Sequence, residues 1–215
     1  MDLIKINEIA YSRMADRSSH NWKDKGNKYY HGQRTANLAL TLREILLPEN
    51  SSSDEILTVS AWFHDISNGS ENHCALGAEK TRQLLSGLCT QDELEQICYI
   101  ISVHDERIEG NNYPEVVKLM QDADLLDHLG TFGVWEHFLY ATAHGETINE
   151  AKDFLLNVAV KQHTEHRMQL NLEFSKLILD EKYAFLKSFA TRFDTELEGR
   201  VWNLDEIIKN GVKNG

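Results

Sequence analysis

Four segments of the chain carry apolar residues at helical spacing, and each of these stripes includes a histidine or an aspartate near one end. At about 100° per residue, offsets of 3 or 4, 7, 10 or 11 and 14 return to one helix face. The members are His31, Leu38, Leu42 and Ile45; Leu57, Ala61 and His64; Leu94, Ile97, Ile101 and His104; and Val117, Met120, Asp124 and Asp127. If the stripes form one core, their polar side chains point inward together.

The residues between the stripes also favour helices. Only two prolines occur, Pro48 and Pro114, and no segment alternates in the manner of a strand. Ser52 with Glu55 and Thr90 with Glu93 have capping-box spacing, and Gly87 suits a helix end. We expect helices over about 3–17, 33–47, 52–65, 72–87, 90–104 and 114–129, and two or three longer ones within 131–208, one of them charged and near 165–190. The sequence therefore predicts one all-α domain, a helical bundle spanning residues 1–215.

The charge and the cysteines exclude several classes of protein. The net charge of −12 opposes binding to a nucleic-acid polymer or an anionic membrane, although a bound metal could still attract a small phosphorylated substrate. The first residues lack the features of a signal peptide, and no apolar run is long enough to span a bilayer. Cys74, Cys89 and Cys98 have no CxxC spacing. We therefore expect reduced thiols in a cytoplasmic protein.

The inward polar residues predict a metal site. A buried carboxylate costs several kcal/mol unless it is paired or binds a metal, and neutral imidazole is a good ligand for divalent ions. A single residue of this kind is more often a hydrogen-bonded core residue or a helix cap, but several in phase on separate helices favour a shared ion. We expect four ligands: His31, His64, Asp65 and Asp124.

Two further expectations concern residues next to these ligands in the sequence. His64 and Asp65 are adjacent, so both reach one ion only if the helix ends or distorts before the turn-forming segment SNGS. Asp127 is expected to contact a ligand instead of the ion, and Asp122 is expected to be solvated.

The pattern H…HD…D formed by these residues resembles the signature of the HD-domain superfamily of metal-dependent phosphohydrolases. The segment YHGQRTANLAL is similar to the family's first ligand helix, and QDADLLDHLG is similar to its last ligand segment, which assigns the ligand to Asp124. The tail from Thr164 is similar to the C-terminal helices of small stand-alone bacterial HD hydrolases. The resemblance implies an HD-type bundle with a metal-binding core over about 20–130 and C-terminal helices over about 131–208.

Two further segments resemble the HD-GYP phosphodiesterases, which bind two metals. HCALGAEKTRQLL maps an additional ligand onto His73, and VHDERIEGNNYP maps another onto His104. The Gly-Tyr-Pro tripeptide is not intact, because Asn112-Tyr113-Pro114 stands in its place. One ion is expected, and a second held by His73 and His104 stays an open alternative to contacts of these residues with phosphate. Asn68 occupies the position of a glutamate in the HD-type deoxynucleotidases, so the general acid stays unassigned.

The resemblance implies hydrolysis of a phosphate ester or anhydride, with a nucleotide as the expected substrate and Mn, Mg, Co or Fe as the metal. In this mechanism Asp65 orients a metal-activated water, Arg34 binds phosphate and His104 donates a proton to the leaving oxygen. Further phosphate contacts are assigned to Lys80, Arg82 and Arg107, and His20 is placed near the mouth of the site.

Two other functions stay open at this stage. One is a di-iron HD-type oxygenase, in which His73 and His104 would be essential ligands. The other is a non-catalytic nucleotide-binding sensor, although a pure binding module would not need all four ligands. The helical surface also offers room for a homodimer.

Overall fold

The computed structural model describes residues 1–19, 23–107 and 112–211, and it confirms the all-α fold. Over these residues no strand forms, and His20 lies outside them. The elements are α1 (Leu3–Met14), α2 (Asn27–Leu46), η1 (Ser51–Ser53), α3 (Asp54–Phe63), α4 (His73–Leu85), α5 (Gln91–Val103), α6 (Glu115–Asp127), α7 (Thr131–Ala143), α8 (Ile148–Asn157), η2 (Ala159–Gln162), α9 (His163–Gln169), α10 (Glu173–Leu197) and α11 (Leu204–Gly211).

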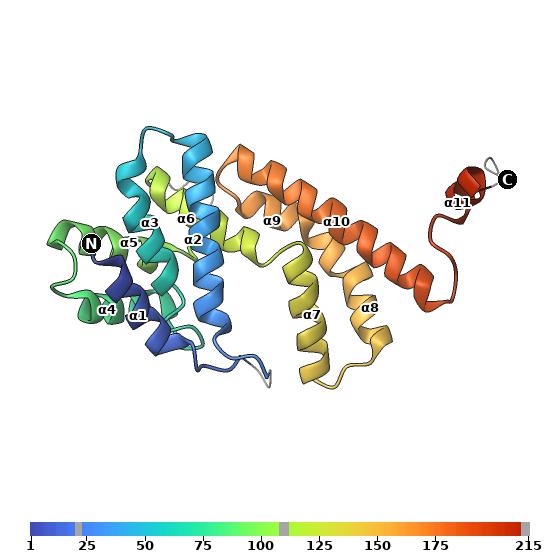
Figure 1. The fold of residues 1–215 in the computed structure, drawn as a ribbon, viewed down its shortest axis with the longest axis horizontal. Coiled ribbons are helices and arrows are strands. Elements are labelled where there is room, and N and C mark those ends of the chain that lie inside the picture. The colour runs from blue at the N-terminus through green and yellow to red at the C-terminus, as the bar shows by residue number, and fades with distance from the viewer. Residues whose placement is uncertain (20–22, 108–111, 212–215) are drawn as a thin grey trace.

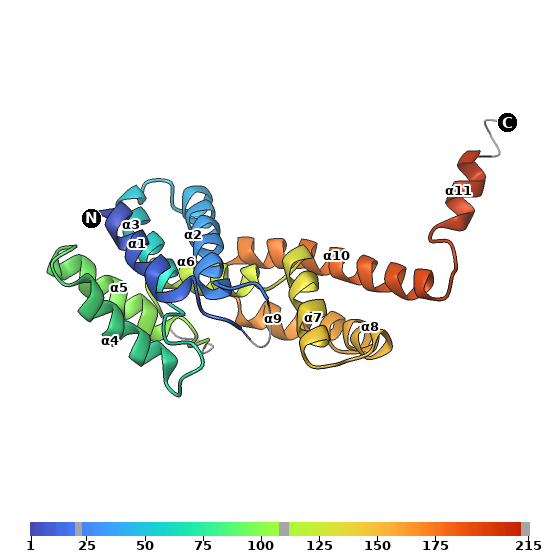
Figure 2. The same cartoon turned by 60° about the horizontal axis from the view of Figure 1, so that its bottom comes forward.

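The helices form two groups, which Figure 1 shows side by side. In the first, α2 packs against α3 and α6, and α4 packs against α5. The second consists of α7 to α10, with α10 running along α8 and reaching back to α6. Figure 2 shows α11 standing apart from both groups beyond the end of α10. None of the described helices has the length and hydrophobicity that a membrane span requires.

The first group contains the main hydrophobic core, and the predicted stripes enter it. Leu57, Ile97, Ile101 and Met120 are completely buried, as expected from their helical phase. Gly32 makes the close approach of α2 and α3 feasible, because a Cβ there would lie 2.8 Å from the Ala61 carbonyl oxygen. The two helices that carry His31 and His64 are thereby held close together.

The prediction for α2 was wrong in two respects. The helix begins at Asn27, about six residues earlier than expected, after Gly26 with a φ of 77°. Ile45, expected to face the core, is 51% exposed. The buried face of α2 is centred on Gly32 and Ala39, which lie about 80–100° around the helix axis from His31. Ile45 lies on the other side of His31, away from this buried face. His31 therefore sits at the edge of the core, within reach of a cleft.

Helix ends were predicted with mixed success. The capping box of Thr90 and Glu93 at α5 is present, and Gly87 adopts a φ of 80° just after α4. The predicted box at Ser52 was wrong, because α3 begins after Ser53 without a side-chain cap and the Ser52 hydroxyl bonds to Asn50 instead. The number of helices after residue 131 was also wrong, since α7 to α11 make five.

Candidate metal centre

Three helices bring their polar side chains to one point. His31 lies on α2, His64 follows the last residue of α3, and Asp124 lies on α6. The Nε2 atoms of the two histidines are 3.0 Å apart, and Asp124 Oδ1 lies 3.1 Å from His31 Nε2 and 3.5 Å from His64 Nε2. Ligand atoms held about 2.1 Å from one ion at right angles are about 3 Å apart. The spacing therefore suits a shared cation.

The proton positions on the two imidazoles favour a cation as well. His64 Nδ1 lies 2.8 Å from the Ala61 carbonyl oxygen, which can only accept, so this nitrogen carries a proton. His31 Nδ1 donates in the same way to Asp127 Oδ2 at 2.7 Å. In the neutral rings each Nε2 atom then carries a lone pair. The two Nε2 atoms face each other and a carboxylate oxygen of Asp124. Such a cluster of acceptors attracts positive charge, which a proton on one ring or a bound divalent metal could supply.

The electrostatics of the cluster favour positive charge at this point. Burial opposes charge on Asp124, but its contacts with His31 and His64 outweigh burial and hold the pKa of Asp124 well below its usual value. Burial also opposes a charged His31, whereas its contacts with Asp124 and Asp127 raise the pKa of that ring. Asp127 bonds to His31 and to no other histidine of the centre, as expected from the sequence. The lowered pKa values favour the ionised form of the Asp124 and Asp127 carboxylates, which is the form that binds cations.

Asp65 reaches the same centre because α3 ends at Phe63. The chain continues in turns, with Ile66 donating to the Phe63 carbonyl and Asn68 to the Asp65 carbonyl. Asp65 Oδ2 lies 3.9 Å from His64 Nε2 and accepts a 2.6 Å bond from Lys28, while Oδ1 accepts from the Asn68 amide at 3.0 Å. Burial would raise the pKa of Asp65, but the charges of His64 and Lys28 lower it below the usual range.

A second group of donors lies beside the first. His104, at the end of α5, has ring centroid distances of 4.9 Å to His64 and 5.3 Å to His73, and the donor atoms of His73, Cys74 and His104 are mutually close. Burial and the charge of His64 lower the pKa of His104 to about 4, and its Nδ1 donates to the Ile101 carbonyl at 2.7 Å. The ring is thus neutral at neutral pH, which suits a ligand better than a proton donor.

The predicted phosphate-binding cations take different positions. Arg34 donates to both oxygens of Asp127, at 2.9 and 2.8 Å, and stacks on Phe132. Arg107 donates to Asp124 Oδ2 at 3.0 Å, so it adjoins the metal centre. Arg82 is paired with Glu95 on the exposed side of α4, and Lys80 is exposed. The structure brings Arg34 and Arg107 to the cluster and keeps Arg82 in a separate ion pair.

The expectation that Asp122 is solvated was wrong. Its side chain is completely buried and accepts bonds from the backbone N–H groups of Asn171, at 2.8 Å, and Leu172, at 2.9 Å. These groups belong to the connection between α9 and α10, which covers this face of α6. Asp122 therefore fastens the second group of helices to the ligand helix.

Two residues of the centre escaped the sequence prediction. Lys28, the partner of Asp65, lies one turn before His31, but the expected helix began after it. His128 lies one turn after Asp124, with Nε2 3.8 Å from Asp124 Oδ1 and its ring 4.5 Å from His31. Extending the helical pattern by one turn before His31 and by one turn after Asp124 would have identified both Lys28 and His128.

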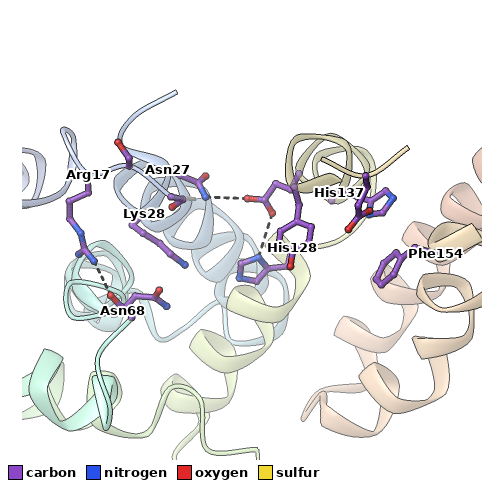
Figure 3. Close-up of a pocket in the computed structure, with 14 residues that line it drawn as sticks. Arg17, Asn27, Lys28, Asn68, His128, His137 and Phe154 are labelled. Carbon is purple, nitrogen blue, oxygen red and sulfur yellow. Dashed lines mark hydrogen bonds and ion pairs between the residues drawn. The ribbon is translucent and has the colours of Figure 1, made fainter. Parts of the chain in front are cut away.

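A pocket of about 860 Å³ adjoins the centre, and Figure 3 shows its lining. Lys28 and His128 belong both to this pocket and to the surroundings of the ligands. Arg17, Asn68 and residues of α7 and α8 complete the wall. The pocket therefore reaches the immediate neighbours of the centre.

Comparison with known proteins agrees with this arrangement. The family model described as HD domain matches residues 29–129, which include all four expected ligands. No curated protein matches the chain.

Several solved structures share the fold. Bacillus subtilis YpgQ in complex with ADP has a TM-score of 0.64 at 20% identity, covering 91% of this chain and 98% of its own. An HD-superfamily hydrolase from Bacillus thuringiensis has a TM-score of 0.68 at 21% identity, covering 92% and 97%. A protein from Listeria innocua has a TM-score of 0.58 at 20% identity, covering 92% and 98%. The chain is thus similar in fold to these proteins over nearly its whole length.

Proposed function

The chain belongs to the HD-domain family, and we propose that it is a divalent-metal-dependent phosphohydrolase acting on a nucleotide or a related phosphate ester or anhydride. The observation that carries the proposal is the convergence of His31 Nε2, His64 Nε2 and Asp124 Oδ1, three acceptors that need a cation between them. The ADP complex of Bacillus subtilis YpgQ supports a phosphorylated ligand for a protein of this fold.

In this proposal His31, His64, Asp65 and Asp124 hold an ion such as Mn, Mg, Co or Fe. Bound there, the ion would polarise a phosphoryl oxygen and lower the pKa of a water molecule to near neutrality. Asp65 orients that water, since its carboxylate faces the centre from the turn after α3. Lys28 and Arg107, which adjoin Asp65 and Asp124, offset the charge of the incoming phosphate.

Asp127 acts through His31. By accepting the Nδ1 proton it fixes the tautomer that presents Nε2 to the ion, and Arg34 in turn holds Asp127. The proposal therefore gives Arg34 a positioning role in addition to the phosphate contact that the family resemblance implies.

The test is elemental analysis of the purified protein with a phosphate-release screen over nucleotides in Mn, Mg, Co and Fe. We expect bound metal and metal-dependent release from the wild type, and loss of both from His64→Ala. A matched control is His144→Ala, which removes an exposed histidine at the end of α7. Full metal content and activity in His64→Ala would contradict the proposal.

The group of His73, Cys74 and His104 favours one second candidate, a di-iron oxygenase. The same preparation separates the two functions. Two tightly bound iron ions and oxygen consumption without phosphate release would support the oxygenase, whereas phosphate release with Mn or Mg supports the hydrolase.

A further inference from the structure

The pocket beside the metal centre has two chemically different ends, and Figure 3 shows them on opposite sides. One end carries Arg17, Lys28 and His128, together with Glu136, which lies 3.7 Å from His128. The other carries aromatic side chains of α7 and α8, including His137 and Phe154. A volume of about 860 Å³ is far larger than one phosphate group needs and lies in the range of pockets for small organic molecules.

The cationic end continues directly into the metal centre. Lys28 donates to Asp65, and His128 lies against His31 and Asp124. The Arg17 guanidinium donates to the carbonyls of Ile66, at 2.8 Å, and Asn68, at 2.9 Å, so it fixes the turn that presents Asp65. A phosphate bound at the metal would therefore lie at this end of the pocket.

The aromatic end is built as a rigid platform. The rings of His137 and Phe154 are stacked, with centroids 4.9 Å apart and planes inclined by 15°. His137 Nε2 donates to the Ala151 carbonyl at 2.9 Å, which ties α7 to α8 and fixes the ring. Phe154 is nevertheless 42% exposed. His137 covers one face of the Phe154 ring, and the exposed remainder of this ring, held in the pocket wall, suits contact with a flat ligand ring.

Charge sets the direction of such a ligand. Glu146, in the connection between α7 and α8, lines the aromatic end and repels phosphate there. At the other end Arg17, Lys28 and His128 outnumber Glu136, so a molecule with a phosphate and a flat uncharged ring fits best with its phosphate toward Lys28 and its ring toward Phe154.

We propose that the His137–Phe154 platform binds the nucleobase of a nucleoside phosphate whose phosphate lies at Lys28 and the metal centre. This inference rests on the proposed function for the role of the phosphate end, and it adds the group that recognises the rest of the substrate. Base stacking on an aromatic side chain changes affinity by roughly 5- to 150-fold on truncation to alanine.

The experiment measures binding of ADP and of inorganic pyrophosphate to the metal-loaded protein by equilibrium dialysis. Phe154→Ala should raise the Kd for ADP about tenfold and leave the Kd for pyrophosphate unchanged. Phe154→Leu keeps the apolar contact, so it should lose part of the ADP affinity without risk to the packing. The matched control is Phe185→Ala, which removes a phenylalanine of similar exposure, 36%, on α10 outside the pocket.

The outcomes separate this proposal from the proposed function. An unchanged Kd for ADP in Phe154→Ala, an equal loss for ADP and pyrophosphate, or no binding of ADP to the wild type would overturn the base platform. A selective loss for ADP in a protein that releases no phosphate would support the platform and reject the hydrolase. Phosphate release by the wild type, together with an unaltered Kd for ADP in Phe154→Ala, would support the hydrolase and reject the platform.

Discussion

Helices α6 and α7 have thirteen residues each, yet ten of those in α6 are buried and only two of those in α7. The ligand helix thus lies inside a dense core, where packing fixes its side chains. The helix that lines the pocket is fastened along one narrow face and leaves Trp135 and Tyr140 exposed. The difference agrees with the proposed function, in which the first group of helices would position the metal ligands and the second would supply the surface that meets the substrate.

Asp122 joins the two groups, so its removal should have the largest effect on stability. Asp122→Ala leaves the backbone donors of Asn171 and Leu172 without their buried carboxylate and should lower the free energy of unfolding by about 3 kcal/mol. Urea unfolding measures this, and Asp122→Asn, which retains one acceptor oxygen, should lose less. A loss below about 1 kcal/mol in the alanine variant would mean that the groups hold together without this link.

Substitution of Asp127 tests the first group of helices alone. Asp127→Asn weakens the acceptor for His31 Nδ1 and should lower metal affinity about 10- to 100-fold. Competition with a metal chelator measures the affinity. Arg34→Gln, which removes the other partner of Asp127 but keeps the carboxylate that accepts from His31, should lower the affinity less. Wild-type affinity in Asp127→Asn would show that the orientation of His31 does not depend on this carboxylate.

Equivalent capping boxes allow the two groups to be compared directly. Thr90 with Glu93 caps α5, and Thr147 with Glu150 caps α8. If the chain is one cooperative domain, Thr90→Ala and Thr147→Ala should each lower the global free energy of unfolding by about 1 kcal/mol. Thermal unfolding followed by circular dichroism gives both values. A normal global stability in Thr147→Ala alone would instead show that the second group unfolds separately.

A further expected effect is a pH dependence confined to the second group. Burial, reinforced by the charge of Glu165, raises the pKa of Tyr183 to about 12. Because the unfolded chain loses this proton near pH 10, the contribution to stability is complete below pH 10 and is lost as the pH rises toward 12. The difference in ultraviolet absorbance between wild type and Tyr183→Phe during alkaline titration measures the pKa. A midpoint near 10 would indicate that α9 and α10 do not shield the ring.

Helical phase predicted from sequence which polar side chains meet, because its information is local. His64, His104 and Asp124 each continue an apolar stripe, and all three are buried where the stripes meet. The same reasoning failed at the start of α2. There Gly26 begins the helix in a left-handed conformation after a polar segment, so Lys28 was assigned to a loop.

The second group was harder to predict because its breaks depend on distant contacts. The chain becomes extended at Leu170 and Leu172, between α9 and α10, without a proline or glycine to mark the change. The backbone there is satisfied by Asp122, 49 or 50 residues earlier in the chain. No local pattern reports such a bond, and the burial of Asp122 was missed for the same reason.

The most direct test of the metal centre is anomalous X-ray diffraction from a crystal grown with Mn and recorded at the manganese absorption edge. We predict a peak bounded by His31 Nε2, His64 Nε2 and Asp124 Oδ1, and any second ion should lie beside His104 and His73. A crystal in which manganese binds only elsewhere, with these three atoms still in mutual contact, would contradict the account.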